Sequence, residues 1–319
     1  MNQSEEVRAV WSIKRRKTVC PAALLMCLLL WWGFCPEAAD AEDPPGGGVR
    51  RSILQGAWYP ADPGVLSRLI HSSLSDATPP EVKGRIRGLV VPHAGYQYSG
   101  PVAAHAYRLI QGRTVERVVL VGPSHRMRFD GISVSRHDAY ETPLGRVPVD
   151  RSLADRLIGF DPEIRFVPDA HAVEHSLEIQ LPFLQTVLKD VSIVPVIMGR
   201  QDPAACSLLA EALVRIVGDD RATLIVASTD LSHFHDDTTA RALDRVFTRH
   251  VKDFDPEGLS LALAAGQCEA CGGGAVVTVL TAFEKLGAGR CVILEYATSG
   301  DVTGDRKRVV GYLSAAILE

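Results

Sequence analysis

Three strand-like apolar segments of this chain each lead into residues that can bind a metal or move a proton. The run IRGLVVP precedes His93, RVVLVG precedes Ser124 and His125, and ATLIVAS precedes Asp230 and His233. In open α/β folds the carboxyl ends of the strands line the ligand crevice, so groups that are distant in sequence can meet there. One histidine at a strand end would say little, but recurrence at three strand ends predicts a shared site.

The segment DAHAVEHSLEIQLPFL adds His171, Glu174, His175 and Glu178. In a helix, His175 and Glu178 would lie three residues apart on one face. Such a pair could bind a metal, or the glutamate could orient the imidazole through a hydrogen bond. Alternatively, both glutamates could simply suit the positive end of a helix dipole.

A second added segment, CEACGGGAVV, places Cys268 and Cys271 before three glycines and a helical pattern. A thiolate at a helix N-terminus is stabilised by the dipole and by free backbone N–H groups, which makes Cys271 a candidate ligand or nucleophile. Taken alone, the C-x-x-C spacing suggests a redox dithiol. A zinc ribbon would need a second such pair, which this sequence lacks.

These groups need a scaffold, and the apolar runs predict an α/β fold. Continuous rather than alternating apolarity indicates strands covered on both faces, as in a mostly parallel sheet flanked by helices, with mixed strand directions possible. The chain has 319 residues, of which 46% are hydrophobic, so it can bury a large core. Its net charge of −4, with scattered Lys and Arg, argues against a nucleic-acid partner.

The N-terminus differs in character from the rest of the chain. KRRK at residues 14–17 precedes a long apolar run, and a small-x-small site ends at Ala41. Residues 1–41 are therefore predicted to be a secretory signal peptide, or an uncleaved membrane anchor, and the protein to be exported or anchored by this segment. The Pro/Gly-rich composition that follows predicts a flexible linker over residues 42–52 and a single domain over 53–319.

Taken in order, the motifs PHAGYQYSGPVAAHAY, GPSHR, EHSLEIQLPF, STDLSHF and CGGGAV resemble the Memo family, whose prokaryotic members are called AmmeMemoRadiSam system protein B. GAWYPADP at residues 56–63 resembles the opening motif of that family. The family is similar to the class III extradiol dioxygenases, which implies a three-layer fold with a mostly parallel or mixed sheet between helices. Those dioxygenases hold Fe(II) with two histidines and a glutamate.

The resemblance implies that His93, His125 and Cys271 are metal ligands. It places Asp230 and His233 in the same pocket, with His175 beside them. Fe(II) is the expected metal, and copper or zinc would also suit imidazole and thiolate ligands. Within this set His175 or His233 could act as a general base while Asp230 orients an imidazole.

On this interpretation the turn after IRGLVVP aims the His93 imidazole at a metal. Gly95 and Gly100 are expected to let the backbone bend close to that metal.

The leading hypothesis is an iron-dependent redox or dioxygenase-like enzyme that acts on a small or peptide-borne substrate. The family name implies a functional link to a radical-SAM protein and an AMMECR1-domain protein. One alternative is a metal- or peptide-binding protein without turnover, because animal members are described as binding phosphotyrosine peptides. Another is a hydrolase or transferase with Cys271 as nucleophile and His93 or His175 as base.

Overall fold

The apolar runs form a nine-stranded sheet in the computed structural model, which describes residues 46–319. In spatial order its strands are β10 (His233–His235), β12 (Val309–Leu318), β2 (Ile86–Val91), β9 (Thr223–Ser228), β3 (Arg117–Pro123), β8 (Ser192–Met198), β4 (Ile132–Val134) and β7 (Ile164–Arg165), and β11 (Arg290–Thr298) also pairs with β12. The central strands β2, β9, β3 and β8 run parallel, whereas β12 and β4 pair with them in the antiparallel sense. The expectation of a mostly parallel or mixed sheet is confirmed in its mixed form.

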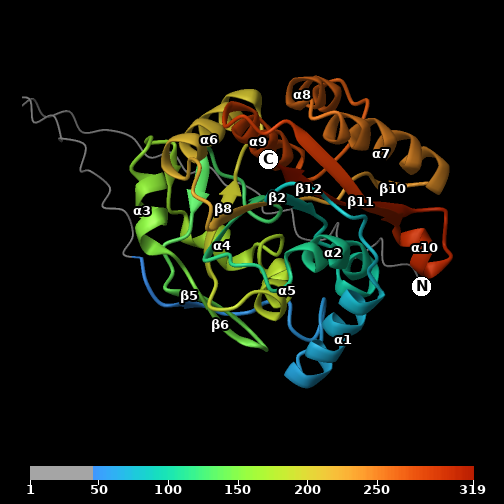
Figure 1. Cartoon of the computed structure of the whole chain (residues 1–319), viewed down its shortest axis with the longest axis horizontal. Helices are drawn as coiled ribbons and strands as arrows, with labels where there is room; N and C mark the ends of the chain where they lie inside the picture. The colour runs from blue at the N-terminus through green and yellow to red at the C-terminus, as the bar shows by residue number, and fades with distance from the viewer. Residues whose placement is uncertain (1–45) are drawn as a thin grey trace, which may run out of the picture. The chain divides into compact units, whose positions relative to one another are not determined.

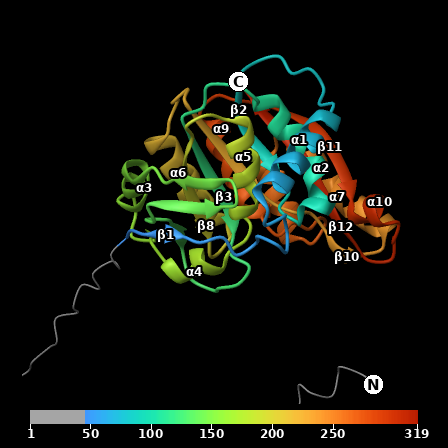
Figure 2. The same cartoon turned by 90° about the horizontal axis from the view of Figure 1, so that it is seen from below.

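Helices cover both faces of this sheet, which gives the three layers seen in Figure 1 and Figure 2. The helices are α1 (Pro63–Asp76), α2 (Tyr96–Ile110), α3 (Arg151–Ile158), α4 (Pro168–Val173), the short 3-10 helix η2 (Glu178–Gln180), α5 (Leu181–Val187), α6 (Pro203–Ile216), α7 (Asp237–Lys252), α8 (Pro256–Ala264), α9 (Gly273–Lys285) and α10 (Ser299–Thr303). In β2, Leu89 and Val91 pack into the core beneath α1, α2 and α5, while Val90 packs into the core beneath α6 to α9. Continuous apolarity in the strand is thus explained by burial on both faces.

A small second sheet holds the segment that enters the domain. It consists of β1 (Val49–Arg50), β5 (Ala139–Thr142) and β6 (Gly145–Pro148), with β1 parallel to β5. Arg50 is buried and forms an ion pair with the buried carboxylate of Glu178. The prediction of a flexible linker is therefore wrong for residues 49–52, because backbone pairing and a buried ion pair fix this part of the segment.

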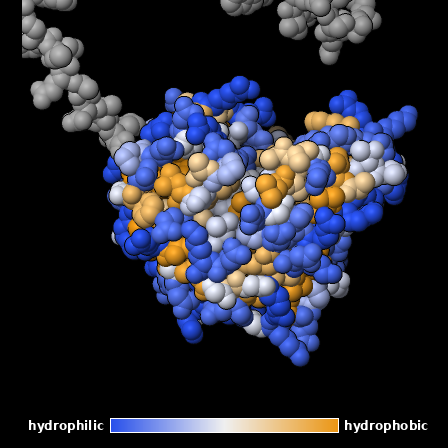
Figure 3. All heavy atoms as spheres, turned by 90° about the horizontal axis from the view of Figure 1, so that it is seen from above, coloured by the Kyte–Doolittle hydropathy of each residue, from blue (hydrophilic) through white to orange (hydrophobic). Residues whose placement is uncertain are grey.

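Within residues 46–319, no helix has the length and apolarity needed to cross a membrane. The predicted signal peptide or anchor over residues 1–41 lies outside the described residues. On the face shown in Figure 3, apolar side chains lie in small groups among hydrophilic ones rather than in one continuous band.

Candidate metal centre

The parallel strands bring the polar strand ends together as the sequence predicts. Val91 of β2 is paired with Ser228 of β9, and the Thr229 N–H donates to the Val91 carbonyl at 2.9 Å. β3 lies on the other side of β9 in the same direction. The turns after these three strands are therefore neighbours, and the Asp230 carboxylate accepts a hydrogen bond from the His93 backbone N–H at 2.7 Å.

Three imidazoles gather at this edge of the sheet. One ring nitrogen from each of His93, His125 and His175 lies within 4.8 Å of the other two. The ring centroids are 5.0 Å apart for His93 and His125, and 4.3 Å apart for His125 and His175. His175 reaches the site because its segment packs tightly on the end of β3, where a Cβ at Gly122 would meet Ser176 Oγ at 2.8 Å. Three imidazoles at this spacing form a suitable donor set for one metal ion.

A buried hydrogen-bond chain fixes the orientation of His93. The Ser228 hydroxyl donates to the Ser176 carbonyl at 2.7 Å and accepts from the Gln180 amide at 2.9 Å. Since the Ser228 proton is already engaged, Ser228 Oγ can only accept from His93 Nδ1, which lies 3.0 Å away. His93 Nδ1 therefore carries the ring proton, and Nε2 presents its lone pair to the site.

The carboxylate of Glu174 fixes the orientation of the His125 ring. Glu174 Oε1 lies 2.9 Å from His125 Nδ1, and Oε2 accepts from the His125 backbone N–H at 2.6 Å. Burial alone would raise the Glu174 pKa, but the hydrogen bonds and nearby imidazoles outweigh it and lower that pKa to about 2. An ionised carboxylate on Nδ1 leaves His125 Nε2 free, which is the usual arrangement of a metal-binding histidine.

His175 is the most loosely held of the three. Its Nδ1 is buried without a hydrogen-bond partner among the described residues, because the 3.3 Å approach to Glu174 Oε1 lacks hydrogen-bond geometry. Its ring packs on Trp58 with centroids 4.6 Å apart. Burial lowers the pKa of His175 to about 4, so the imidazole is neutral at pH 7. A neutral imidazole with a buried, unpaired nitrogen can offer a lone pair to a metal ion, and binding the ion would satisfy that nitrogen.

Cys271 lies beside His93, with Sγ 3.0 Å from His93 Nε2. Its loop presses against the end of β9, because the Cys271 N–H donates to the Asp230 carbonyl at 3.2 Å and a Cβ at Gly272 would stand 2.3 Å from the Ser228 carbonyl oxygen. Glycine at position 272 is thus what allows the close approach. Burial and the adjacent Asp230 raise the pKa of the Cys271 thiol. All four cysteines of residues 46–319 are free thiols, including Cys268.

Asp230 and His233 complete the surroundings of the imidazoles. Burial raises the pKa of Asp230 to about 7, although the hydrogen bond from the His93 N–H opposes the shift. His233 Nδ1 donates to the Leu231 carbonyl at 2.7 Å, which leaves Nε2 available. Burial also lowers the His233 pKa. Each group can therefore exchange a proton near neutral pH or below it.

Sequence reasoning found His93, His125, His175, Asp230 and Cys271, and the structure places them together. The three-histidine group contains His175, which the sequence analysis expects only beside the ligands, whereas Cys271 adjoins it through His93. Ser228, Gln180 and Trp58 were missed, because no local pattern marks a residue that acts through another side chain.

Two expectations about supporting residues are wrong. Glu178 does not orient His175 but accepts hydrogen bonds from residues 50–59. Gly95 has φ −57° and a Cβ there would meet only van der Waals contacts, at 3.5 Å or more, and the same holds for Gly100 within α2. Neither position requires glycine for the backbone to approach the site.

This chain is similar to known proteins over most of its length. The sequence model for "Memo-like protein" matches residues 50–316. The chain belongs to the Memo family. A MEMO1 family protein of Methanothermobacter thermautotrophicus is 38% identical over 83% of this chain and 98% of its own length. One of Ignicoccus hospitalis is 39% identical over 83% and 96%, and one of Thermotoga maritima is 36% identical over 84% and 99%.

Among solved structures, an uncharacterized protein from Escherichia coli K12 aligns with a TM-score of 0.48 and 18% identity, covering 73% of this chain and 100% of that chain. At this level of similarity it adds nothing to the assignment. The aligned region makes up almost the whole length of these Memo relatives.

Proposed function

We propose that this Memo-family protein holds one metal ion, Fe(II) in the first place, and uses it in redox chemistry on a small or peptide-borne substrate. The observation that carries the proposal is the group of three imidazoles within 4.8 Å of one another. Ser228 and Glu174 hold the Nδ1 atoms of His93 and His125, so the donor atoms are arranged before a metal arrives.

His93 and His125 are the proposed core ligands, and Cys271 is the proposed third, with His175 placed to join or replace it. Three protein ligands leave positions open for water, substrate or oxygen, and imidazole suits iron, copper and zinc alike. When bound, such an ion would supply Lewis-acid and one-electron chemistry. Asp230 and His233 of this chain are the groups that would hold or release protons beside it.

Metal content of anaerobically purified residues 43–319 tests this proposal. Wild type should bind about one iron per chain, and His93→Ala and His125→Ala should lose it. Cys271→Ser and His175→Ala then identify the third ligand by which of them loses more metal. His105→Ala is the matched control, because its Nδ1 contacts the Pro101 carbonyl of its own helix. If wild type binds no metal with its thiols reduced, or if the control loses as much as the ligand variants, the proposal fails.

One observation favours a second function, a cysteine-dependent hydrolase or transferase. The 3.0 Å contact between Cys271 Sγ and His93 Nε2 resembles a nucleophile and its base. Burial, however, raises the thiol pKa and also lowers the His93 pKa, which disfavours the reactive ion pair. Rapid alkylation of Cys271 in metal-free protein would support this function, and slow alkylation would exclude it.

A further inference from the structure

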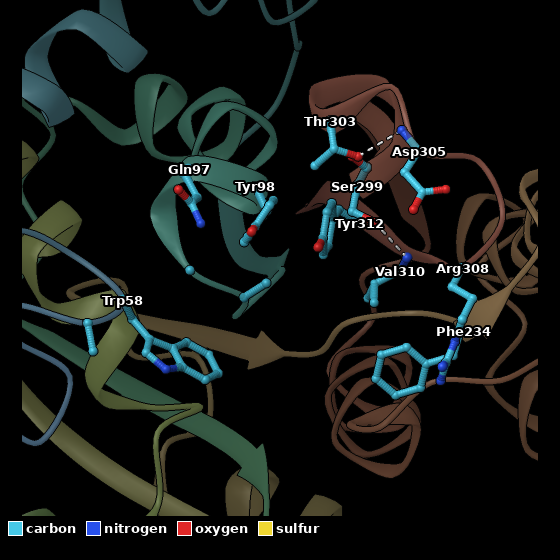
Figure 4. A pocket seen from close by; sticks show the side chains of 13 residues that line it. Trp58, Gln97, Tyr98, Phe234, Ser299, Thr303, Asp305, Arg308, Val310 and Tyr312 are labelled. Atoms are coloured by element: carbon cyan, nitrogen blue, oxygen red, sulfur yellow. Dashed lines mark hydrogen bonds between the residues drawn. The ribbon is translucent and has the colours of Figure 1, made fainter. Parts of the chain in front are cut away.

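A cavity of about 520 Å³ is lined by residues that contact or directly follow two of the three imidazoles. Trp58 forms part of its wall and also packs on the His175 ring at 4.6 Å. Ala94 and Gly95, which directly follow His93, line it as well. Figure 4 shows Trp58 entering the space from one side and Phe234 from the other. A ligand in this cavity would therefore lie against the residues that hold the metal ligands.

Phe234 is held in this wall at an energetic cost. It has φ +64°, a left-handed conformation that is unusual for a bulky residue, and the residue is 61% exposed. It sits at an irregularity between β10 and β12, where His233 pairs with Val310 and His235 with Val309. Bulges of this kind redirect side chains and are frequent near active sites. An exposed aromatic ring held by a strained backbone makes Phe234 a candidate ligand contact.

The same wall carries a cation that lacks a carboxylate partner. The Arg308 guanidinium lies 5.2 Å from the Phe234 ring centroid, and no carboxylate of residues 46–319 is within 4.0 Å of it. Its neighbour Arg306, by contrast, pairs with Asp237 at 2.8 Å. Asp305 also lines the cavity, and its carboxylate accepts from the Lys307 N–H. The wall thus offers one guanidinium to a ligand, with a carboxylate close by that would repel a dianion.

We propose that this cavity binds the substrate, and that the substrate is a small molecule with a flat ring and a single carboxylate. The ring lies between Trp58 and Phe234, with Tyr98 and Tyr312 as further aromatic walls, and the carboxylate meets Arg308. The term substrate rests on the proposed function of the adjacent metal centre. The ligand class itself rests only on the cavity.

Trp58 supplies a direct readout, because it is the only tryptophan in residues 43–319. Its emission is followed while benzoate, benzamide, acetate or phenyl phosphate is added to purified residues 43–319. Benzoate should change the emission saturably. Benzamide, which keeps the ring without the charge, and acetate, which keeps the charge without the ring, should each bind at least about ten-fold more weakly.

Arg308→Gln should weaken benzoate binding about ten-fold, which is the effect expected for losing one charge-assisted hydrogen bond. Lys307→Gln is the matched control. It removes an adjacent exposed cation that does not line the cavity, and should change affinity less than two-fold. Phe234→Leu should also weaken benzoate binding. This variant should still bind benzoate more tightly than benzamide, because Arg308 is unchanged.

Several results would overturn the inference. The first is that benzamide binds as tightly as benzoate, and the second is that Lys307→Gln weakens benzoate binding as much as Arg308→Gln does. The third is that Trp58 emission shows no saturable change below about 50 mM benzoate, which corresponds to a binding free energy weaker than about 2 kcal/mol. Tighter binding of phenyl phosphate would refute the single-carboxylate class. Metal content is measured on the same samples. Bound metal without benzoate binding refutes this inference alone, whereas benzoate binding without metal refutes the proposed function alone.

Discussion

The buried carboxylate of Glu178 is predicted to hold the Trp58 segment against the metal centre. Its side chain is fully buried and it accepts hydrogen bonds from five groups, namely the Arg50 guanidinium, the Ser52 and Tyr59 hydroxyls, and the backbone N–H groups of Ile53 and Leu54. Glu178→Gln keeps the shape of the side chain but removes its charge. The glutamine amide has one acceptor oxygen instead of two, so it can accept fewer of these hydrogen bonds. Its N–H groups would point at other hydrogen-bond donors.

The size of the effect follows from what is left unpaired. The Arg50 side chain is only 2% exposed, and removing one partner of a buried ion pair costs about 3–5 kcal/mol. Arg50 also donates to the backbone carbonyls of His171 and Glu174, which softens the loss toward the lower end. One unsatisfied donor adds about 1 kcal/mol. The expected total is about 4 kcal/mol, or a fall in Tm of about 10 °C for a domain of this size.

Urea unfolding of residues 43–319, followed by Trp58 emission, measures this change. Glu141→Gln is the control, because it removes the carboxylate of a surface pair in which Arg51 is 77% exposed, and should cost less than about 1 kcal/mol. Arg50→Met should cost less than Glu178→Gln, since the carboxylate keeps four hydrogen bonds. Equal losses in Glu178→Gln and Glu141→Gln, or a loss below about 1 kcal/mol for Glu178→Gln, would refute the reasoning.

Two other predictions concern Glu174 and His171. Glu174→Gln should weaken metal binding about 10–100-fold in a chelator competition, because the acceptor on His125 Nδ1 loses its charge, while exposed Glu163→Gln should leave affinity unchanged. The His171 pKa is lowered to about 3, mainly by burial and then by His137 and Arg50, although the charge of Glu174 opposes the shift. As pH falls below about 6.5, His171 therefore becomes protonated in the unfolded state before it does so in the folded state. The free energy of unfolding should therefore fall from pH 6.5 toward pH 4.5 more steeply in wild type than in His171→Gln, by up to about 1.4 kcal/mol per pH unit, and equal slopes in urea unfolding would contradict this.

The convergence of His93, His125 and Asp230 could be predicted because it follows from strand direction alone. Apolar runs imply strands buried on both faces, such strands are usually parallel, and parallel strands end at one edge. The roles of Glu174 and Glu178 could not be predicted in this way. The two glutamates are four residues apart in one motif, and only tertiary placement decides which faces His125 and which faces Arg50.

The N-terminal part of the domain was misjudged for a related reason. Residues 42–48 have the composition of a linker, and this composition led to the same expectation for the residues that follow them. Arg50, however, has its partners more than 100 positions away in the sequence. Trp58 was missed on the same ground, since His175, which its ring contacts, is more than 100 positions away in the sequence. Strand direction predicts where distant turns meet, but no local pattern identifies the partner that a buried side chain selects.

The short segment from Glu174 to Gln180 links the three imidazoles to the Trp58 wall of the cavity. Glu174 orients His125, and His175 belongs to the imidazole group. Glu178 anchors residues on both sides of Trp58, and Gln180 orients His93 through Ser228. Only its last three residues are helical, so its side chains project in several directions rather than onto one face. Because one segment contacts ligands and cavity wall together, metal binding should tighten the Trp58 wall and a cavity ligand should in turn strengthen metal binding, as linkage requires. A benzoate affinity that is identical with and without metal would show that the two sites are independent despite their shared segment.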